Sequence, residues 1–156
     1  MPSIAHQVSL GWGNPDSAGF ERANIVSMTL PHGEKIRVNK EMVLIFSSFI
    51  ADLVKLGVVI EEKILDDWGY ANRPIRGSVN KSFHAWGLAI DLNATKNPMG
   101  VNKTTFPIVS TRALCAKYKL RWGYDYSGRK DAMHFEFMGS VADARALTSK
   151  IRAGKI

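Results

Sequence analysis

Two short segments of the sequence hold most of the residues that could carry chemistry. Residues 82–93 read SFHAWGLAIDLN, and residues 131–137 read DAMHFEF. Together they contain two of the four histidines, two aspartates and one glutamate. Zinc accepts neutral imidazole and carboxylate as ligands, and a catalytic zinc site usually combines three protein ligands with water. The residue types therefore indicate a metal site, provided that the chain brings both segments together.

The spacing of His84 and Asp91 is informative about the local backbone. On a helix, seven residues would separate the two side chains by about 10.5 Å along the axis. This is too far for two ligand bonds of about 2.0–2.2 Å to one ion. On a regular strand, the two side chains would point to opposite faces. A break at Gly87 resolves both problems, with His84 in a turn and Asp91 in the strand that follows.

The second segment fits the same site. In the strand pattern HFEF, Phe135 and Phe137 point to one face, which we expect to be the core, while His134 and Glu136 point to the other, towards a cleft. Asp131 lies three residues before His134, close enough to reach the same site if the chain turns. A carboxylate at such a site can act as general base and then protonate the leaving amine. Glu136 would orient a metal ligand through a hydrogen bond.

The remaining candidates for chemistry have simpler interpretations. We expect His6 and His32 to be ordinary surface or core histidines, His32 lying in a PHG turn. The single cysteine, Cys115, excludes an internal disulfide framework and a four-cysteine zinc site. We expect Cys115 to be a small, buried, apolar residue on a helix.

The elements that must position these residues can be read from the rest of the chain. Its 156 residues suggest a single domain over 1–156, large enough to support a core. Residues 1–33 are rich in turns, apart from a short strand near 24–30. Periodicity and capping signals predict helices over 39–56, 107–118 and 140–153, and strands over 85–92, 120–124 and 134–138; residues 58–65 fit either a strand or a short helix. The prediction is an α+β fold, in which a short antiparallel sheet and about three helices surround the zinc site.

The charge of the chain is concentrated in its second part. The formal net charge is +7. Residues 96–156 contain twelve Lys and Arg against four acidic residues, whereas residues 1–95 contain nine against ten. Such a surface attracts polyanions, including anionic cell-wall polymers, or serves only to keep the protein soluble. No nucleic-acid-binding motif accompanies it, so we expect no nucleic-acid partner. The helix over 140–153 is amphipathic, and its apolar side is expected to pack on the domain rather than on a membrane.

At the motifs above, the sequence resembles the zinc D-Ala-D-Ala carboxypeptidase and L-alanyl-D-glutamate peptidase family, particularly its phage endolysin members. SFHAWGLAIDLN matches the family signature S-x-H-x-x-G-x-A-x-D, and DAMHFEF matches the acidic-x-x-H element. Upstream, YANRPIRGS is similar to a Y-x-x-R-x-x-x-G-S stretch of phage members. The resemblance extends over about residues 37–138.

The resemblance implies roles for individual residues. His84, Asp91 and His134 would bind one zinc ion per chain, and Asp131 would be the catalytic base, a position where many members have Glu. Arg73 would stabilise the oxyanion, with Arg76 as the competing candidate. Three further residues are candidates for lining the substrate groove, although Trp122 fits a core position equally well: Ser82, Trp86 and Trp122.

The function implied is hydrolysis of a peptidoglycan stem peptide, at an L-alanyl-D-glutamate or D-alanyl-D-alanine bond, by a monomeric phage lysin. Because the sequence shows no secretory signal and no membrane span, we expect synthesis in the host cytoplasm and action on the cell wall after release. The alternative is a non-catalytic, zinc-stabilised module that binds the cell wall or belongs to a virion. Asp131 and Arg73 argue against this alternative, because a purely structural site needs neither residue.

Overall fold

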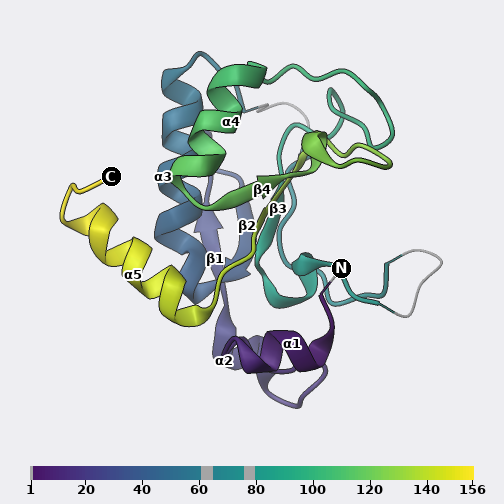
Figure 1. Ribbon diagram of the computed structural model, residues 1–156, viewed down its shortest axis with the longest axis vertical. Coiled ribbons are helices and arrows are strands. Elements are labelled where there is room, and N and C mark those ends of the chain that lie inside the picture. Colours follow the sequence, from purple (N-terminus) through teal and green to yellow (C-terminus); the bar gives the residue numbers. More distant parts are fainter. Residues whose placement is uncertain (1, 61–64, 76–79) are drawn as a thin grey trace.

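The computed structural model describes residues 2–60, 65–75 and 80–156 and shows an α+β architecture, as predicted (Figure 1). In these ranges lie five α-helices: α1 (Ile4–Ser9), α2 (Phe20–Asn24), α3 (Val43–Lys55), α4 (Ile108–Lys117) and α5 (Val141–Arg152). Five strands form two antiparallel sheets: β1 (Ile25–Thr29), β2 (Lys35–Asn39), β3 (Ala89–Asp91), β4 (Leu120–Trp122) and β5 (His134–Phe137). The sequence predicted one sheet and about three helices. The two additional helices, α1 and α2, are too short to show a helical period, and both lie in the turn-rich N-terminal segment.

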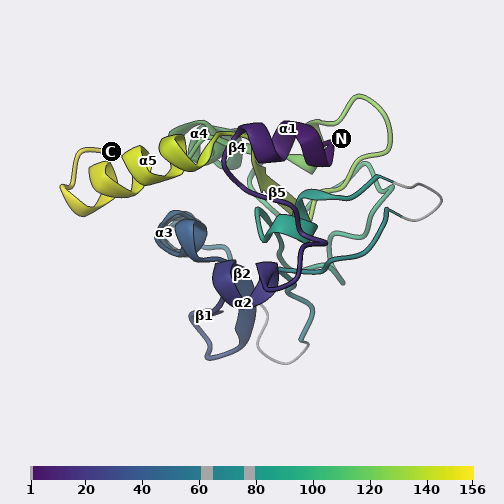
Figure 2. The ribbon, with the colours of Figure 1, turned by 90° about the horizontal axis from the view of Figure 1, so that it is seen from below.

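The helix predicted over 39–56 is confirmed as a 3₁₀ turn, η1 (Lys40–Met42), that continues into α3. The Asn39 side chain begins this turn by accepting a hydrogen bond from the backbone of Glu41. The chain leaves the helix at Gly57, where φ is +89° and a residue without a side chain is favoured. Helices α4 and α5 both pack along α3 (Figures 1 and 2).

The second sheet has the strand order β3-β5-β4, with β5 in the centre. In its register Asp91 pairs with His134, and Trp122 pairs with Phe135. Phe135 lies in the core, where its ring packs 5.0 Å from that of Phe49 on α3. The sheet therefore brings two candidate ligands from distant parts of the sequence side by side.

The predicted break at Gly87 is confirmed. Phe83–Trp86 form a 3₁₀ turn (η2) that ends at Gly87 with φ of +69°. A Cβ atom at Gly87 would lie 2.4 Å from the backbone nitrogen of Asn39, so this position requires glycine. The strand predicted over 85–92 is limited to β3, because the turn occupies the first residues of that range.

The N-terminal segment and α5 complete the domain. The indole nitrogen of Trp12 donates to the carbonyl of Gly139, 2.8 Å away, just before Ser140 and Asp143 form the capping box that begins α5. In Figure 2, α1, α4 and α5 lie on one side of α3, and β1 and β2 lie on the other. Val58–Ile60 adopt no helix or strand, and residues 61–64 of the ambiguous segment lie outside the described residues. No helix among the described residues is long and apolar enough to cross a bilayer.

Candidate metal centre

His84 projects from the turn η2, and its ring is oriented by a backbone carbonyl. The Nδ1 atom lies 2.7 Å from the carbonyl oxygen of Gly69. Since a carbonyl can only accept a hydrogen bond, Nδ1 carries the proton and donates. The other ring nitrogen, Nε2, therefore has a free lone pair.

His134 is oriented in the same way by a carboxylate. Its Nε2 atom lies 2.7 Å from Oε2 of Glu136, whose other oxygen pairs with the guanidinium of Arg121. Burial opposes ionisation of Glu136, but the hydrogen bond and charge of His134, followed by the charge of Arg121, hold its pKa below the usual value. An ionised Glu136 accepts a hydrogen bond from Nε2, which keeps its proton, so the lone pair of His134 lies on Nδ1.

The two free lone pairs and the carboxylate of Asp91 converge. His84 Nε2 lies 3.2 Å from His134 Nδ1 and 3.2 Å from Asp91 Oδ2, while His134 Nδ1 lies 3.1 Å from Asp91 Oδ1. In a tetrahedral zinc site with bonds of about 2.0–2.1 Å, neighbouring ligand atoms are about 3.3 Å apart. Three electron-pair donors at this separation repel one another unless a cation lies between them. The donor set and its spacing therefore fit zinc.

The pKa shifts of His134 and Asp91 point to the same need for positive charge. Burial opposes a charged His134, yet hydrogen bonds to Asp91 and Glu136 and the charges of both carboxylates raise its pKa to about 10. Burial likewise opposes ionisation of Asp91, but the charge of His84 and the hydrogen bond with His134 hold the pKa of this carboxyl far below its ordinary value. Without a metal, the cluster attracts a proton in its place.

Asp131 lies beside this cluster but outside the group of three ligands. Its backbone nitrogen donates to the carbonyl of Gly123, and its carbonyl accepts from the backbone of His134. The Oδ1 atom is buried and has no hydrogen-bond partner. Burial raises the pKa of Asp131; the charges of His134 and His84 lower it, and those of Asp91 and Glu136 raise it further. A half-buried carboxylate with a free oxygen and a raised pKa is suited to accepting and returning a proton.

Of the two candidate arginines, only Arg73 lies among the described residues. The exposed Arg73 lies two residues after Ala71, whose nitrogen donates to the carbonyl of His84, but no hydrogen bond or ion pair joins its side chain to the three ligands in the described structure. Arg76 lies outside the described residues. Ser82 is the N-cap residue of η2 and is half-buried, with no side-chain capping bond.

Two of the residues considered for the substrate groove belong to the core. Trp86 is fully buried and donates its indole proton to the carbonyl of Gly13. Trp122 is 2% exposed and donates to the carbonyl of Ala132. Neither indole offers a surface to a substrate. The burial of Trp86 in η2 and of Trp122 in β4 depends on tertiary packing, which the local sequence pattern does not reveal.

Residues 76–137 match the family model described as D-alanyl-D-alanine carboxypeptidase. The match contains all three converging ligands and Asp131, and it is narrower than the range of 37–138 expected from the motifs. A search of curated proteins found no match, and neither did a search of solved structures. The match covers less than half of the chain, and it is a similarity to a family of peptidases.

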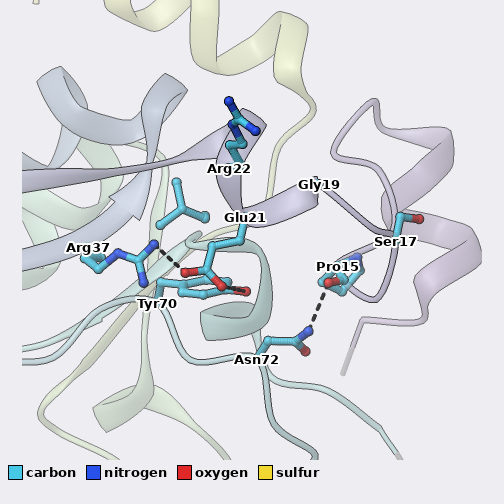
Figure 3. Close-up of a pocket in the computed structure, with 9 residues that line it drawn as sticks. Pro15, Ser17, Gly19, Glu21, Arg22, Arg37, Tyr70 and Asn72 are labelled. Atoms are coloured by element: carbon cyan, nitrogen blue, oxygen red, sulfur yellow. Dashed lines mark hydrogen bonds and ion pairs between the residues drawn. The ribbon is translucent and has the colours of Figure 1, made fainter.

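An open pocket of about 640 Å³ is lined by residues between Pro15 and Asn72, outside the matched range (Figure 3). At its centre the carboxylate of Glu21 pairs with Arg37 at 2.6 Å, and the hydroxyl of Tyr70 lies 3.5 Å away. Asn72 closes one end by donating to the carbonyl of Pro15. Tyr70 follows the residue whose carbonyl orients His84, so one short backbone segment borders both the pocket and the ligands.

Several functional contacts were missed by reasoning from sequence. The carbonyl of Gly69 is a backbone group and leaves no signal in the sequence. The sequence also offers no reason to select Arg121. Its place opposite Glu136 follows from the register of β4 and β5 in the structure. His32 was expected to be an ordinary histidine in a turn, but its side chain lies close to those of Glu34 and Asp67.

Proposed function

We propose that this protein is a zinc-dependent peptidase that hydrolyses a stem-peptide bond of peptidoglycan, of the L-alanyl-D-glutamate or D-alanyl-D-alanine type. One observation carries the proposal: three lone-pair donors converge at 3.1–3.2 Å beside the half-buried Asp131, whose Oδ1 atom is buried and free of hydrogen bonds. The carboxypeptidase match over the same residues supports it. A purely structural metal site would not need the additional carboxylate.

His84 Nε2, His134 Nδ1 and the carboxylate of Asp91 would hold the metal. When bound, zinc supplies Lewis acidity that activates water and polarises the carbonyl to be attacked. The contribution of this chain is to keep both imidazoles in the correct tautomer. Gly69 does so for His84, and Glu136 does so for His134.

Asp131 would move the proton. Its Oδ1 atom accepts the proton of the attacking water and then delivers it to the nitrogen of the leaving amine. The raised pKa of this carboxyl makes its ionised form a stronger base than an exposed aspartate. Asp131 occupies the position where many members of the family have Glu, so its shorter side chain must lie closer to the substrate.

Arg73 would bind the oxygen of the polarised carbonyl as negative charge develops on it. An exposed guanidinium that forms no ion pair with the described residues can turn towards a bound peptide, and its fork of donors suits an oxyanion. We assign the pocket of Figure 3 to the part of the stem peptide that extends from the cleaved bond, because Tyr70 lines the pocket next to Gly69. Stem peptides carry free carboxylates, which Arg22 of the pocket would attract, whereas Arg37 already pairs with Glu21.

The biological setting that we propose is a phage lysin. Its support is the similarity of YANRPIRGS to phage members of the family and the basic character of residues 96–156, which suits an anionic cell wall. Lysis should then weaken at high ionic strength, where the Debye length falls below about 10 Å.

The release of amino groups from purified sacculi by the zinc-loaded protein tests the proposal. Asp131→Asn should retain one zinc at the candidate centre but lose about 10²–10⁴-fold in rate, the usual contribution of general acid–base catalysis. Asp125→Asn is the matched control, because Asp125 forms an exposed ion pair with Arg112 away from the centre. A rate for Asp131→Asn that equals the control would refute its role, and a zinc-loaded protein that releases nothing would refute the function.

A further inference from the structure

A second group of metal-ligating side chains lies outside the candidate metal centre. His32 and Glu34 come from the turn between β1 and β2, and Asp67 comes from the segment before Trp68. Each offers a ligand atom, and these atoms lie within 4.8 Å of one another. The side chains of His32 and Glu34 are 7% and 10% exposed, and Asp67 is 2% exposed. We call these three residues the hairpin cluster.

Two polar atoms of the hairpin cluster are buried without partners. Asp67 accepts a hydrogen bond from the backbone of Asn93 at Oδ1, but its Oδ2 atom has none. His32 Nε2 lies 3.1 Å from Glu34 Oε2, whereas its Nδ1 atom is buried and unpartnered. Buried polar groups are nearly always hydrogen-bonded, and a cation bound at the cluster would give Asp67 Oδ2 the partner that it lacks.

The charges of the cluster are also unbalanced. Two carboxylates face each other, and no Lys or Arg among the described residues forms an ion pair with Glu34 or Asp67. Burial, together with the hydrogen bond and charge of Glu34 and the charge of Asp66, raises the pKa of Asp67 to about 7, against the hydrogen bond from the backbone of Asn93. A cation between these groups would remove the repulsion and occupy the free lone pairs.

We propose that His32, Glu34 and Asp67 form a second divalent-cation site, of the zinc type. One imidazole and two carboxylates are a ligand set that zinc accepts, whereas calcium and magnesium prefer oxygen alone. Water would complete the coordination. The proposal does not depend on whether the protein is a peptidase.

The position of the hairpin cluster suggests a structural role for its cation. Directly after Asp67, the backbone of Trp68 exchanges two hydrogen bonds with that of Asp91, at 2.8 and 2.9 Å. The next carbonyl, that of Gly69, orients His84. A cation bound by both Asp67 and His32 would thus hold in place the backbone of Trp68 and Gly69, which contacts two ligands of the first metal centre.

Zinc stoichiometry after equilibrium dialysis tests the second site. The wild-type protein should retain two zinc ions per chain, Asp67→Asn one, His84→Ala one, and the double variant none. Asparagine keeps the Oδ1 acceptor for Asn93 and removes only the charge. Asp125→Asn, the same exchange at a surface ion pair, should retain both ions.

Thermal unfolding gives a readout independent of activity. In His84→Ala, where the hairpin cluster alone should bind zinc, added zinc should raise the melting temperature by a few degrees, and adding Asp67→Asn should abolish this shift. Should Asp67→Asn fail to fold, His32→Gln replaces it. Wild-type protein that holds one zinc and loses it completely in His84→Ala would overturn the proposal, as would unchanged stoichiometry in a folded Asp67→Asn.

Discussion

Replacing Glu136 by Gln removes the negative charge that orients His134 but keeps an oxygen in its place. The wild-type carboxylate accepts from His134 Nε2 at 2.7 Å and is almost fully buried, its side chain being 3% exposed. A glutamine can still accept this hydrogen bond through its amide oxygen. Its amide nitrogen then faces Arg121, whose side chain is 46% exposed and can turn into water at little cost.

The magnitude follows from the change in the hydrogen bond. A bond to an ionised group contributes about 1.5–3 kcal/mol, and a neutral one about 0.5–1.5 kcal/mol. The variant should therefore hold zinc about 1–2 kcal/mol less tightly, which is a factor of about 5–30 in the dissociation constant. This overlaps the loss of about 10–100-fold that is typical when the partner of a metal-binding histidine is removed.

Competition with a chromophoric chelator measures this dissociation constant directly. Glu41→Gln is the matched control, because Glu41 pairs with Arg145 at the start of the α3 region, with no contact to the centre. The control should bind zinc as the wild type does, and excess zinc should restore much of the activity of Glu136→Gln. A folded Glu136→Gln with unchanged zinc affinity would show that Glu136 does not position His134 for the metal.

Three further predictions concern single positions. Asp131→Glu should retain part of the activity that Asp131→Asn loses, and because the pKa of Asp131 is raised above 3.8, the acidic limb of kcat/KM should lie above that pH, as a pH–rate profile would show. Burial opposes ionisation of Asp52, but hydrogen bonds from Lys117 and Tyr118 lower its pKa to about 2. The ionised Asp52 therefore stabilises the fold fully above pH 3.8, and this stabilisation is lost as the pH falls towards 2. In urea unfolding, the free energy of unfolding of Asp52→Asn should lack about 1–2 kcal/mol of this pH dependence, after allowance for screening. A pH profile identical to that of the wild type would exclude the ion pair as the source of the pH dependence. Gly87→Ala should cost at least about 2 kcal/mol of unfolding free energy, because of the positive φ and the 2.4 Å approach to the backbone; a cost below about 0.5 kcal/mol would contradict the close packing seen there.

The part of the site that could be predicted from the sequence is the part encoded locally. The separation of His84 and Asp91 excluded a regular helix and a regular strand, and the break at Gly87 follows from that exclusion. Alternation in HFEF placed His134 and Glu136 on one side of a strand. These inferences needed only element geometry, which is why the backbone at both motifs agrees with them.

What could not be predicted depends on contacts between distant segments. His32 and Asp67 are separated by 34 intervening residues, and nothing in the PHG turn indicates a carboxylate opposite it. The burial of Trp86 likewise depends on Gly13, which belongs to the N-terminal segment. The cleft expected beside Glu136 is instead covered by Arg121 from β4, because both faces of β5 are packed. Such outcomes are set by tertiary packing rather than by local pattern.

Mass spectrometry of the fragments released from purified sacculi tests the central claim most directly. With zinc, the wild-type protein should release fragments cleaved at one stem-peptide bond, of the L-alanyl-D-glutamate or D-alanyl-D-alanine type. EDTA should abolish the release, added zinc should restore it, and His84→Ala should release none under any condition. Cleavage that persists in EDTA or in a folded His84→Ala would contradict the account, as would fragments cut only in the glycan strands.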